Sequence, residues 1–347
     1  MAKYKIGQKA ILTDSDGTRD LIAESLVHMG TFTATNTVAS LSPDYFTNYF
    51  TVPYSFQGST SGYTSGGETL SGVDLNIIDK FPFSSDANAT DVGDLTVARE
   101  RGAGQSSSTF GYVSGGVGNQ SLNTIDRFPF SSDGNATDVG DLLEAKYNLS
   151  GQSSSQSGYT AGGEPFTNVI QKFSFSANAN ATDVGDLTAN RRASAGQSSA
   201  DNGYVSGGEA PPSPPPSNIN IIEKFPFSTD ANSTDVGDLI NTLTREAAGQ
   251  SSTNSGYVSG GLNQSNVIQK FPFAADANST DVGDLTDGRN AVTGQSSTTN
   301  GYSAGGIIGG SPPITNIIDK FPFSSDANAT DVGDLTGERE FATGQQV

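Results

Sequence analysis

The side chains best suited to chemistry in this sequence lie in one short acidic phrase that recurs along the chain. In its first copy, Asp86, Asn88, Asp91 and Asp94 place carboxylate and amide oxygens two or three residues apart. Oxygen ligands at close spacing are what a calcium loop uses. The EF-hand version of that loop requires glycine at position 6 and glutamate at position 12. This copy has Asp91 and Val97 at those places, so it departs from the EF-hand pattern.

A hairpin turn explains the same phrase without a metal ion. Asp and Asn side chains commonly accept hydrogen bonds from nearby backbone amides in turns. The third copy also replaces the first aspartate with Asn178, which removes a charge that a cation site would use. We therefore expect a turn and no metal site, and calcium binding is the alternative.

Each copy of the phrase also contains a glycosylation sequon. The sequon asparagines are Asn88, Asn135, Asn180, Asn232, Asn278 and Asn328. The opening residues, Met1 to Lys5, are not followed by the apolar segment of a secretory signal. We expect no signal peptide, and we interpret the sequons as six copies of one turn.

Other catalytic constellations are missing from the sequence. There is no cysteine, and His28 is the one histidine, which excludes thiolate chemistry and a multi-histidine metal site. No nucleophile elbow, Walker loop or zinc pattern is present. Carboxylate pairs recur six times, whereas a catalytic pair should break the symmetry of a repeat. We expect no enzymatic activity and no cofactor.

The charge balance narrows the classes of partner. Aspartate and glutamate number 37 against 18 lysines and arginines, which gives a formal net charge of -19. Such a chain repels phosphate backbones and anionic lipid headgroups. No apolar run approaches the roughly 20 residues of a membrane span. We expect no nucleic-acid partner and no membrane insertion.

The acidic phrase belongs to a longer unit that occurs six times, at intervals of roughly 45–50 residues. Thr-Asp-Val-Gly-Asp-Leu begins at Thr90, Thr137, Thr182, Thr234, Thr280 and Thr330. A Gly-Tyr pair, followed by a double glycine, places its tyrosine at Tyr63, Tyr112, Tyr159, Tyr204, Tyr257 and Tyr302. Phe-Pro-Phe or a close variant begins at Phe81, Phe128, Phe173, Phe225, Phe271 and Phe321.

Each unit is predicted to contain four short strands. In the second copy these cover residues 102–107, 110–114, 123–130 and 137–143, with turn residues between them. One such sheet cannot bury both of its faces, but six sheets closed into a ring can bury them against one another. The fold class predicted is all-β: a six-bladed β-propeller of four-stranded blades, with a short mixed segment at the N-terminus.

The ring is expected to close with strands from both ends of the repeat region. Residues 341–347 resemble the inner strand of the previous copy at 291–295, and no good match precedes Tyr63. We predict that 341–347 completes the first blade beside Tyr63. Six glutamines of these inner strands should form a ring near the channel or, alternatively, satisfy backbone groups there: Gln105, Gln152, Gln197, Gln250, Gln295 and Gln345.

Lysine or arginine follows an acidic or amide residue in every third strand. These residues are Lys80, Arg127, Lys172, Lys224, Lys270 and Lys320. Given the net charge, we expect stems packed between blades and paired with a carboxylate such as the aspartate of the Val-Gly-Asp phrase, rather than a basic patch.

Residues 1–57 lack the repeat, and residues 58–347 contain it. Residues 3–13 are expected to form a strand and residues 18–29 a helix that ends at Gly30. The stretch after it is rich in aromatic residues, among them Tyr45, Phe46, Tyr49 and Phe50. A short segment cannot bury these by itself. We interpret it as an attachment segment, or alternatively as a cap on one propeller face.

The copies differ most between their second and third strands. The fourth copy carries Pro211, Pro212, Pro214, Pro215 and Pro216 there, a stiff composition. The sixth copy carries apolar and proline residues at Ile307, Ile308, Pro312 and Pro313. Similar blades with divergent loops on one rim are typical of a binding face on a rigid scaffold. Drift of unconstrained surface loops is the alternative.

The repeat resembles the kelch repeat. The resemblance rests on Gly-Tyr-Val-Ser-Gly-Gly, a strand that ends in an aromatic residue, an Asp/Asn turn and then an arginine. The arginines are Arg99, Arg191, Arg289 and Arg339, with Lys146 and Arg245 near the equivalent places. Where kelch repeats have a tryptophan on the fourth strand, this chain has valine, as at Val92.

The phrase Lys-Phe-Pro-Phe, continued by Asp-Ala-Asn-Ala-Thr-Asp-Val-Gly-Asp-Leu, is similar to repeat proteins of marine bacteriophages that are regarded as virion or tail-fibre components. The resemblance implies a non-enzymatic virion structural protein on a tail or capsid surface. Its N-terminal segment would bind other virion proteins, and its loops would contact a host surface glycan or protein. A cellular kelch-type interaction or adhesion module is the alternative.

Overall fold

The computed structural model describes residues 10–13, 20–23, 56–211, 217–242, 244–309 and 313–347. By its internal contacts the chain divides into two units, residues 1–53 and residues 54–347. The described residues contain strands and no helix. A search of them for a helix long and apolar enough to cross a membrane finds none.

The N-terminal unit contains a two-stranded antiparallel sheet. Strand β1 (Ala10–Thr13) pairs with β2 (Asp20–Ala23), and Ile11 lies opposite Ile22. The helix predicted over residues 18–29 is therefore wrong at residues 20–23. The two strands flank an Asp-Gly pair, a sequence typical of hairpins, and Leu21 and Ile22 suit a strand as well as a helix. Residues Tyr45, Phe46, Tyr49 and Phe50 lie outside the described residues.

The larger unit is a six-bladed β-propeller, as predicted from the repeats. Each blade is a four-stranded antiparallel sheet. The innermost strands are β30 (Thr343–Gln346), β6 (Ala103–Ser106), β10 (Ser150–Ser153), β14 (Ala195–Ser198), β20 (Ala248–Ser251) and β25 (Thr293–Ser296). The second strands are β3 (Ser61–Ser65), β7 (Phe110–Ser114), β11 (Ser157–Ala161), β15 (Asn202–Ser206), β21 (Ser255–Ser259) and β26 (Asn300–Ala304).

The outer half of each blade follows the same order. The third strands are β4 (Ile77–Pro82), β8 (Thr124–Pro129), β12 (Thr167–Ser174), β18 (Ile221–Pro226), β22 (Val267–Pro272) and β28 (Ile317–Pro322). The fourth strands are β5 (Thr90–Asp94), β9 (Thr137–Asp141), β13 (Thr182–Arg191), β19 (Thr234–Asp238), β23 (Thr280–Asp284) and β29 (Thr330–Asp334). Five of the third strands end at the proline of Phe-Pro-Phe, which cannot donate a ladder hydrogen bond.

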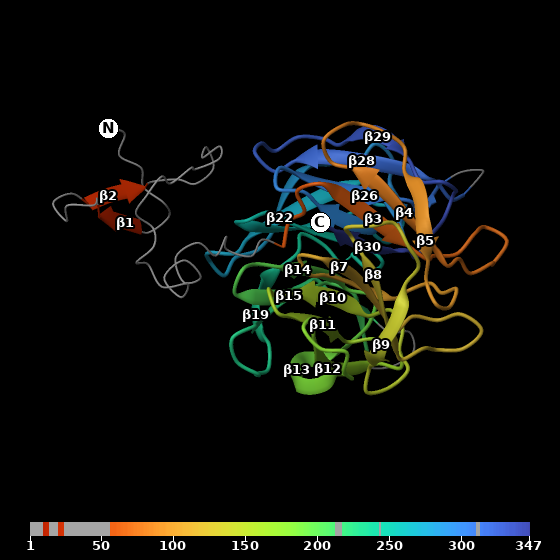
Figure 1. Ribbon diagram of the computed structural model, residues 1–347. Coiled ribbons are helices and arrows are strands. Elements are labelled where there is room, and N and C mark those ends of the chain that lie inside the picture. The colour runs from red at the N-terminus through yellow and green to blue at the C-terminus, as the bar shows by residue number, and fades with distance from the viewer. Residues whose placement is uncertain (1–9, 14–19, 24–55, 212–216, 243, 310–312) are drawn as a thin grey trace. The chain divides into compact units, whose positions relative to one another are not determined.

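The first blade contains the last strand of the chain. Strand β30 pairs with β3, and Gln345 lies opposite Tyr63. Figure 1 shows the blue β30 beside the orange β3, at the junction of the two ends of the propeller. Hydrogen bonds between the ends of the repeat region therefore hold the ring closed.

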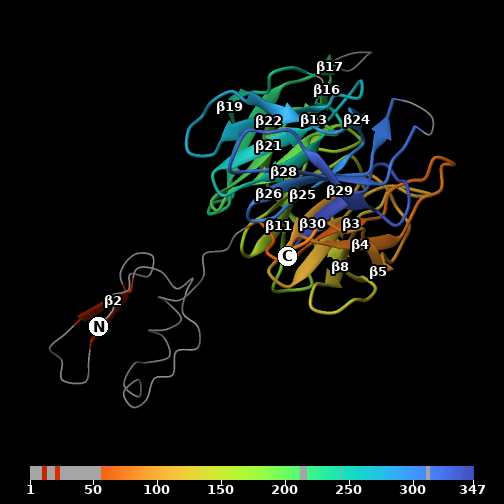
Figure 2. The ribbon, with the colours of Figure 1, turned by 90° about the horizontal axis from the view of Figure 1, so that it is seen from above.

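Two small ribbons extend the blades on one face. Strand β16 (Glu209–Ala210) pairs with β17 (Ser217–Asn218), and Figure 2 shows this ribbon at the border of the propeller. Strand β24 (Arg289–Asn290) pairs with β27 (Ile307–Ile308). Both ribbons use residues of the connection between a second and a third strand.

The hydrophobic core lies between neighbouring blades. At one such interface Tyr63 packs on Phe128 and Phe130 of the next blade, with ring centroids 5.4 and 4.9 Å apart. Ile78 and Val113 belong to this cluster and are fully buried. The same tyrosine-to-phenylalanine contact recurs at every interface around the ring. Aromatic pairs of this kind add about 0.5–1.5 kcal/mol each beyond the area that they bury.

Candidate functional site

The six inner strands surround a narrow central channel. The second residue of each is a glycine, and the six are Gly104, Gly151, Gly196, Gly249, Gly294 and Gly344. A Cβ atom on Gly151 would lie 2.2 Å from the Gly104 carbonyl oxygen, and one on Gly104 would lie 2.1 Å from the Gly344 oxygen. Neighbouring inner strands therefore lie too close together for any side chain at these glycine positions. The cavity that all six inner strands surround has a volume of about 140 Å³.

The two ends of the channel differ. At one end the chain enters the propeller across the last residues of the inner strands. Gln57 donates from Nε2 to the Ser251 carbonyl at 3.0 Å, and the Gly58 amide donates to the Ser296 carbonyl at 2.8 Å. The opposite end, where the inner strands begin, is the channel mouth. Each second strand runs antiparallel to its inner strand, so it ends at the mouth, as the pairing of Ala103 with Ser114 shows.

One residue per blade forms the rim of the channel mouth. These residues are Arg101, Asn148, Ala193, Glu246, Ala291 and Phe341, and each has a φ between 53° and 61°. Non-glycine residues adopt this left-handed region infrequently, and where they do it often marks a special site. Backbone hydrogen bonds join them around the rim. For example, the Asn148 amide donates to the Arg101 carbonyl at 2.8 Å, and the Arg101 amide to the Phe341 carbonyl at 2.9 Å.

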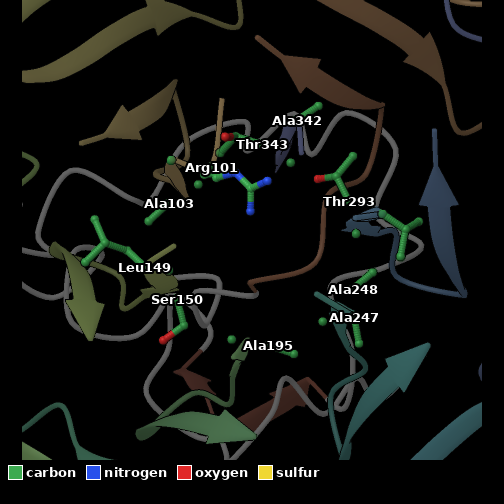
Figure 3. A pocket seen from close by; sticks show the side chains of 18 of the residues that line it. Arg101, Ala103, Leu149, Ser150, Ala195, Ala247, Ala248, Thr293, Ala342 and Thr343 are labelled. Carbon is green, nitrogen blue, oxygen red and sulfur yellow. The ribbon is translucent and has the colours of Figure 1, made fainter. Parts of the chain in front are cut away.

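Arg101 projects into the opening of the channel, surrounded by small side chains such as Ala103 and Thr293 (Figure 3). Its Nε donates to Glu100 at 3.0 Å and its Nη1 to Asn148 at 3.4 Å. The guanidinium carbon lies 3.3 Å from the centroid of the Phe341 ring, a cation–π contact. Three neighbouring blades thus hold this guanidinium in place.

A second charged group occupies the opposite part of the rim. Glu209 bridges two arginines: Arg192 donates to its Oε2 at 2.8 Å, and Arg245 to its Oε1 at 3.1 Å. Arg192 also donates to Glu164 at 2.7 Å. Glu246 lies 3.4 Å from the Arg245 Nε. Because each charge has a fixed partner, these side chains form a rigid polar wall.

Carboxylates outnumber cations on the Arg101 side of the mouth. Burial raises the pKa of Glu100 to about 7, although Arg101 opposes the rise, and the nearby Glu68 adds to it. Burial and Glu68 also raise the pKa of Glu340 from its ordinary value, again against Arg101. Both glutamates therefore retain a proton at higher pH than a free side chain would.

The rim residues and the loops behind them enclose a second cavity of about 440 Å³. Its lining includes three arginines, Arg101, Arg192 and Arg245, and three glutamates, Glu100, Glu209 and Glu246. The remaining lining residues are Val117, Tyr147, Asn148 and Ala193. The cavity is polar, and the blades that line it contribute different residues.

The divergent loops predicted as a binding rim lie on this same face. Isolated bridges join Glu100 to Val117 and Arg192 to Glu209, so the connections between second and third strands lie beside the mouth. Pro211 is exposed at the end of β16. Ile307 and Ile308 form β27 and are half-buried, and Pro313 is half-buried beside them. Pro212, Pro214, Pro215, Pro216 and Pro312 lie outside the described residues.

The acidic turns contact the neighbouring blade. Asn135 Oδ1 accepts a hydrogen bond from the Asp94 amide at 3.1 Å, and Asp133 pairs with Lys80 at 3.1 Å. The lysine of the third strand thus pairs with a carboxylate, as expected, but this carboxylate is the first aspartate of the turn in the next blade and not the aspartate of Val-Gly-Asp. Within Thr-Asp-Val-Gly-Asp, Asp91 Oδ1 accepts a hydrogen bond from the Gly93 amide. Arg127 contacts Asn178, which stands where the other turns have aspartate.

The six inner-strand glutamines form a ring, but they lie between blades and not in the channel wall. Gln105 Nε2 donates to the Tyr159 carbonyl at 3.0 Å, and Gln345 Nε2 to the Tyr112 carbonyl at 3.1 Å. Every other inner-strand glutamine makes the same contact with the next blade. All six are fully buried. They satisfy backbone groups, which is the alternative that the sequence left open.

Buried ion pairs connect the arginine that precedes an inner strand to the third strand of the same blade. Arg99 pairs with Asp126 and Arg339 with Asp79, at 3.0 and 2.9 Å. Arg191 pairs likewise with Glu223, and Arg289 with Asp319. In the fifth blade the equivalent residue is the buried Thr244 and not Arg245, because Arg245 contacts Glu209 at the mouth.

Among the residues that the structure describes, no group of three or more His, Asp or Glu side chains is arranged to hold a metal ion. The mouth residues were not singled out from the sequence. Their signal is nevertheless present there: the pair of residues after the position of Arg99 is different in each of the six copies, whereas phrases such as Thr-Asp-Val-Gly-Asp-Leu do not change. A comparison with models of known protein families finds no match, and a search of curated proteins finds none either.

Proposed function

We propose that this protein is a non-enzymatic binding module that contacts its target with the face around the channel mouth. One observation carries the proposal. The contacts that hold neighbouring blades together, such as Gln105 to the Tyr159 carbonyl, repeat in all six blades. The rim positions of the mouth, in contrast, hold arginine, asparagine, alanine, glutamate and phenylalanine. Constant contacts between blades together with variable residues on one face are typical of a protein that binds a target with that face.

The path of the chain supports this orientation. The chain enters the propeller at the end of the channel opposite the mouth, where Gln57 and Gly58 contact the last residues of the inner strands. These entry residues are therefore not among those that line the cavity at the mouth.

The proposal extends to a place of action: a bacteriophage virion, on the tail or capsid surface. The similarity of the repeated phrase to marine phage virion proteins supports this step. Residues 1–57, with Tyr45, Phe46, Tyr49 and Phe50, would bind other virion proteins. The mouth would then contact a host surface glycan or protein.

Two experiments test the two parts separately. Mass spectrometry of purified virions from the source tests the place of action, and absence of the chain from them would contradict it. A pull-down of a soluble cellular partner would then favour the cellular interaction module. Binding of the full chain to cells of the host tests the face: Arg101→Ala should abolish binding, and Arg127→Lys, which changes contacts with Asn178 and with the Phe110 ring away from the mouth, should retain it.

A further inference from the structure

We infer that the cavity at the channel mouth binds a neutral, polyhydroxylated ligand, that is, a sugar unit. The inference rests on the proposed function, because it assumes that the mouth is the binding face. It adds the chemical class of the ligand, argued from the size, the charge and the hydrogen-bonding groups of the cavity.

The cavity has the size and rigidity of a small-molecule site. Its volume of about 440 Å³ lies within the range of about 300–1,000 Å³ that is common for such sites. Its charged walls are already fixed in the free protein, since Glu209 holds both Arg192 and Arg245, and Arg101 lies on Phe341. Pre-organised walls lower the entropic cost of binding.

The charges around the cavity disfavour ligands of either sign. Above the pKa of Glu100, which is about 7, three arginines and three glutamates in the lining carry equal and opposite charge. An anionic ligand would also approach Glu68, Glu340 and a chain with a net charge of -19. A cationic ligand would meet the Arg101 guanidinium in the centre of the opening (Figure 3). A neutral polar ligand avoids both repulsions.

The groups that face the cavity match hydroxyl chemistry. A hydroxyl both donates and accepts, so it can bridge a carboxylate and a guanidinium that stand side by side. The lining alternates these groups, as in the pair Arg245 and Glu246. Arg101 uses Nε and Nη1 for its contacts with Glu100 and Asn148, and neither contact uses its Nη2. Tyr147, half-buried in the wall, offers an aromatic ring next to these polar groups.

The repeat itself supplies substitutions that the fold tolerates. Arg101→Ala introduces the residue that stands at the equivalent rim positions Ala193 and Ala291, with φ of 53° and 55°. Tyr147→Asn introduces the residue found at the equivalent Asn290. The matched control, Arg127→Lys, copies the other five blades and lies on an outer strand away from the cavity. Thermal unfolding of each variant verifies that the fold is kept.

The experiment measures binding of the full chain to small probes by saturation-transfer NMR and titration calorimetry. The neutral probes are the methyl glycosides of glucose, galactose, mannose and N-acetylglucosamine. The anionic probes are N-acetylneuraminic acid and a hexaglutamate peptide, and the cationic probe is a hexalysine peptide. We expect saturable binding of at least one neutral glycoside, at least tenfold weaker in Arg101→Ala and in Tyr147→Asn and unchanged in Arg127→Lys. Raising the salt concentration from 50 to 500 mM should change this affinity less than twofold, since no net charge is neutralised.

Three results would overturn the inference: no binding of any neutral glycoside, equal binding by wild type and Arg101→Ala, or stronger binding of a charged peptide that weakens steeply with salt. Its failure is distinguishable from failure of the proposed function. If the full chain binds host cells through Arg101 but no neutral glycoside binds or competes, the mouth is a binding face for a ligand of another class. If cell binding is also independent of Arg101, the proposed function fails as well.

Discussion

Arg99 and Asp126 form an ion pair that is closed to solvent, with 3.0 Å between Nη2 and Oδ2 and side chains that are 1% and 0% exposed. Thr96 joins the pair, because its hydroxyl and its amide both donate to the same carboxylate. Burial lowers the pKa of Arg99, and the nearby carboxylate of Asp126 opposes that change. Each of these buried charged groups has its partner only while the other is present, so removing one of them should lower the free energy of unfolding.

Breaking one partner of this pair should cost more than replacing the whole group. Asp126→Gln leaves Arg99 without a counter-charge and should lower the free energy of unfolding by about 3–5 kcal/mol. In the third blade the same positions hold Leu143, Lys146 and Gln171, so the third strand supplies an amide in place of the carboxylate. The Leu143 amide donates to Gln171 at 2.8 Å, and Lys146 pairs with Glu144 at 3.1 Å.

The quadruple variant Thr96→Leu, Val97→Glu, Arg99→Lys, Asp126→Gln copies that blade, because Val97 stands where the third blade has Glu144. It should lose less than half of what Asp126→Gln loses, as measured by urea denaturation. A quadruple variant less stable than the single one would show that the two arrangements are not interchangeable.

The glycine ring around the channel should be intolerant of a single methyl group. A Cβ on Gly151 would lie 2.2 Å from the Gly104 carbonyl oxygen, so Gly151→Ala must move two blades apart within a closed ring. We expect a loss of at least about 1–3 kcal/mol in unfolding free energy, the usual cost of overpacking. Thermal and urea unfolding would measure it.

Gly134 provides the control for this variant. No atom lies within 4 Å of a Cβ built there, and the equivalent residue of the first blade is Ala87. Gly134→Ala should therefore be neutral or stabilising by about 0.4–1 kcal/mol, because it restricts the unfolded chain. If both variants lost the same unfolding free energy, the close approach of the inner strands would not explain the loss in Gly151→Ala.

The propeller could be predicted from the sequence because its signals are repeated. The Gly-Tyr and Phe-Pro-Phe phrases predict a second and a third strand in each of the six copies. A wrong assignment in one copy would therefore disagree with the assignments in the others. Closure by residues 341–347 followed from their similarity to residues 291–295, and β30 pairs with β3 as that similarity implied. The same logic fails for residues 20–23, where a single unrepeated segment suits a strand and a helix equally well.

The candidate site was harder to predict for a different reason. Arg101, Asn148 and Glu246 line one cavity, and each has a left-handed backbone conformation that arginine and glutamate adopt infrequently, so their residue types do not predict the arrangement. The buried ion pairs, in contrast, leave a trace in the sequence. Where the third strand has Asp126 the preceding segment has Arg99, and where it has Gln171 the arginine is replaced by Lys146.

The carboxyl groups at the channel mouth should make the free energy of unfolding depend on pH near neutrality. The pKa of Glu100 is about 7 in the folded protein and about 4.3 in an unfolded chain. Between these values the folded state binds more protons than the unfolded state, so unfolding free energy should fall as pH rises from about 4.5 to 7. The raised pKa values of Glu340 and Asp74 act in the same direction, and burial followed by Glu68 causes both rises. At Glu340, Arg101 opposes the rise in pKa and Glu246 adds to it.

Glu100→Gln keeps the size and shape of the side chain and replaces its titratable carboxyl group with an amide. The variant should match the wild type at pH 4 and exceed it in stability by about 1–3 kcal/mol at pH 8. Urea denaturation at a series of pH values measures the difference. Parallel pH profiles for the two proteins would mean that Glu100 is not the group that titrates.

Three glutamines of the inter-blade ring, Gln152, Gln250 and Gln295, have a buried Oε1 atom without a hydrogen-bond partner. In the second blade Ser114 donates to Gln105 Oε1 at 2.8 Å, and in the first blade Ser65 donates to Gln345 in the same way. In the third blade that serine is replaced by Ala161, and Gln152 Oε1 is buried without a hydrogen-bond partner. Ala161→Ser should supply the missing donor, because Ala161 pairs with Ser150 in the register in which Ser114 pairs with Ala103.

The expected gain from Ala161→Ser is about 0.5–1.5 kcal/mol in unfolding free energy, the net contribution of one buried hydrogen bond. The reverse change, Ser114→Ala, should cost at least as much, because it leaves Gln105 Oε1 unpaired. Differential scanning calorimetry of both variants measures the two shifts in melting temperature. A destabilised Ala161→Ser variant beside an unchanged Ser114→Ala variant would show that packing around the alanine, and not the glutamine, controls stability at this position.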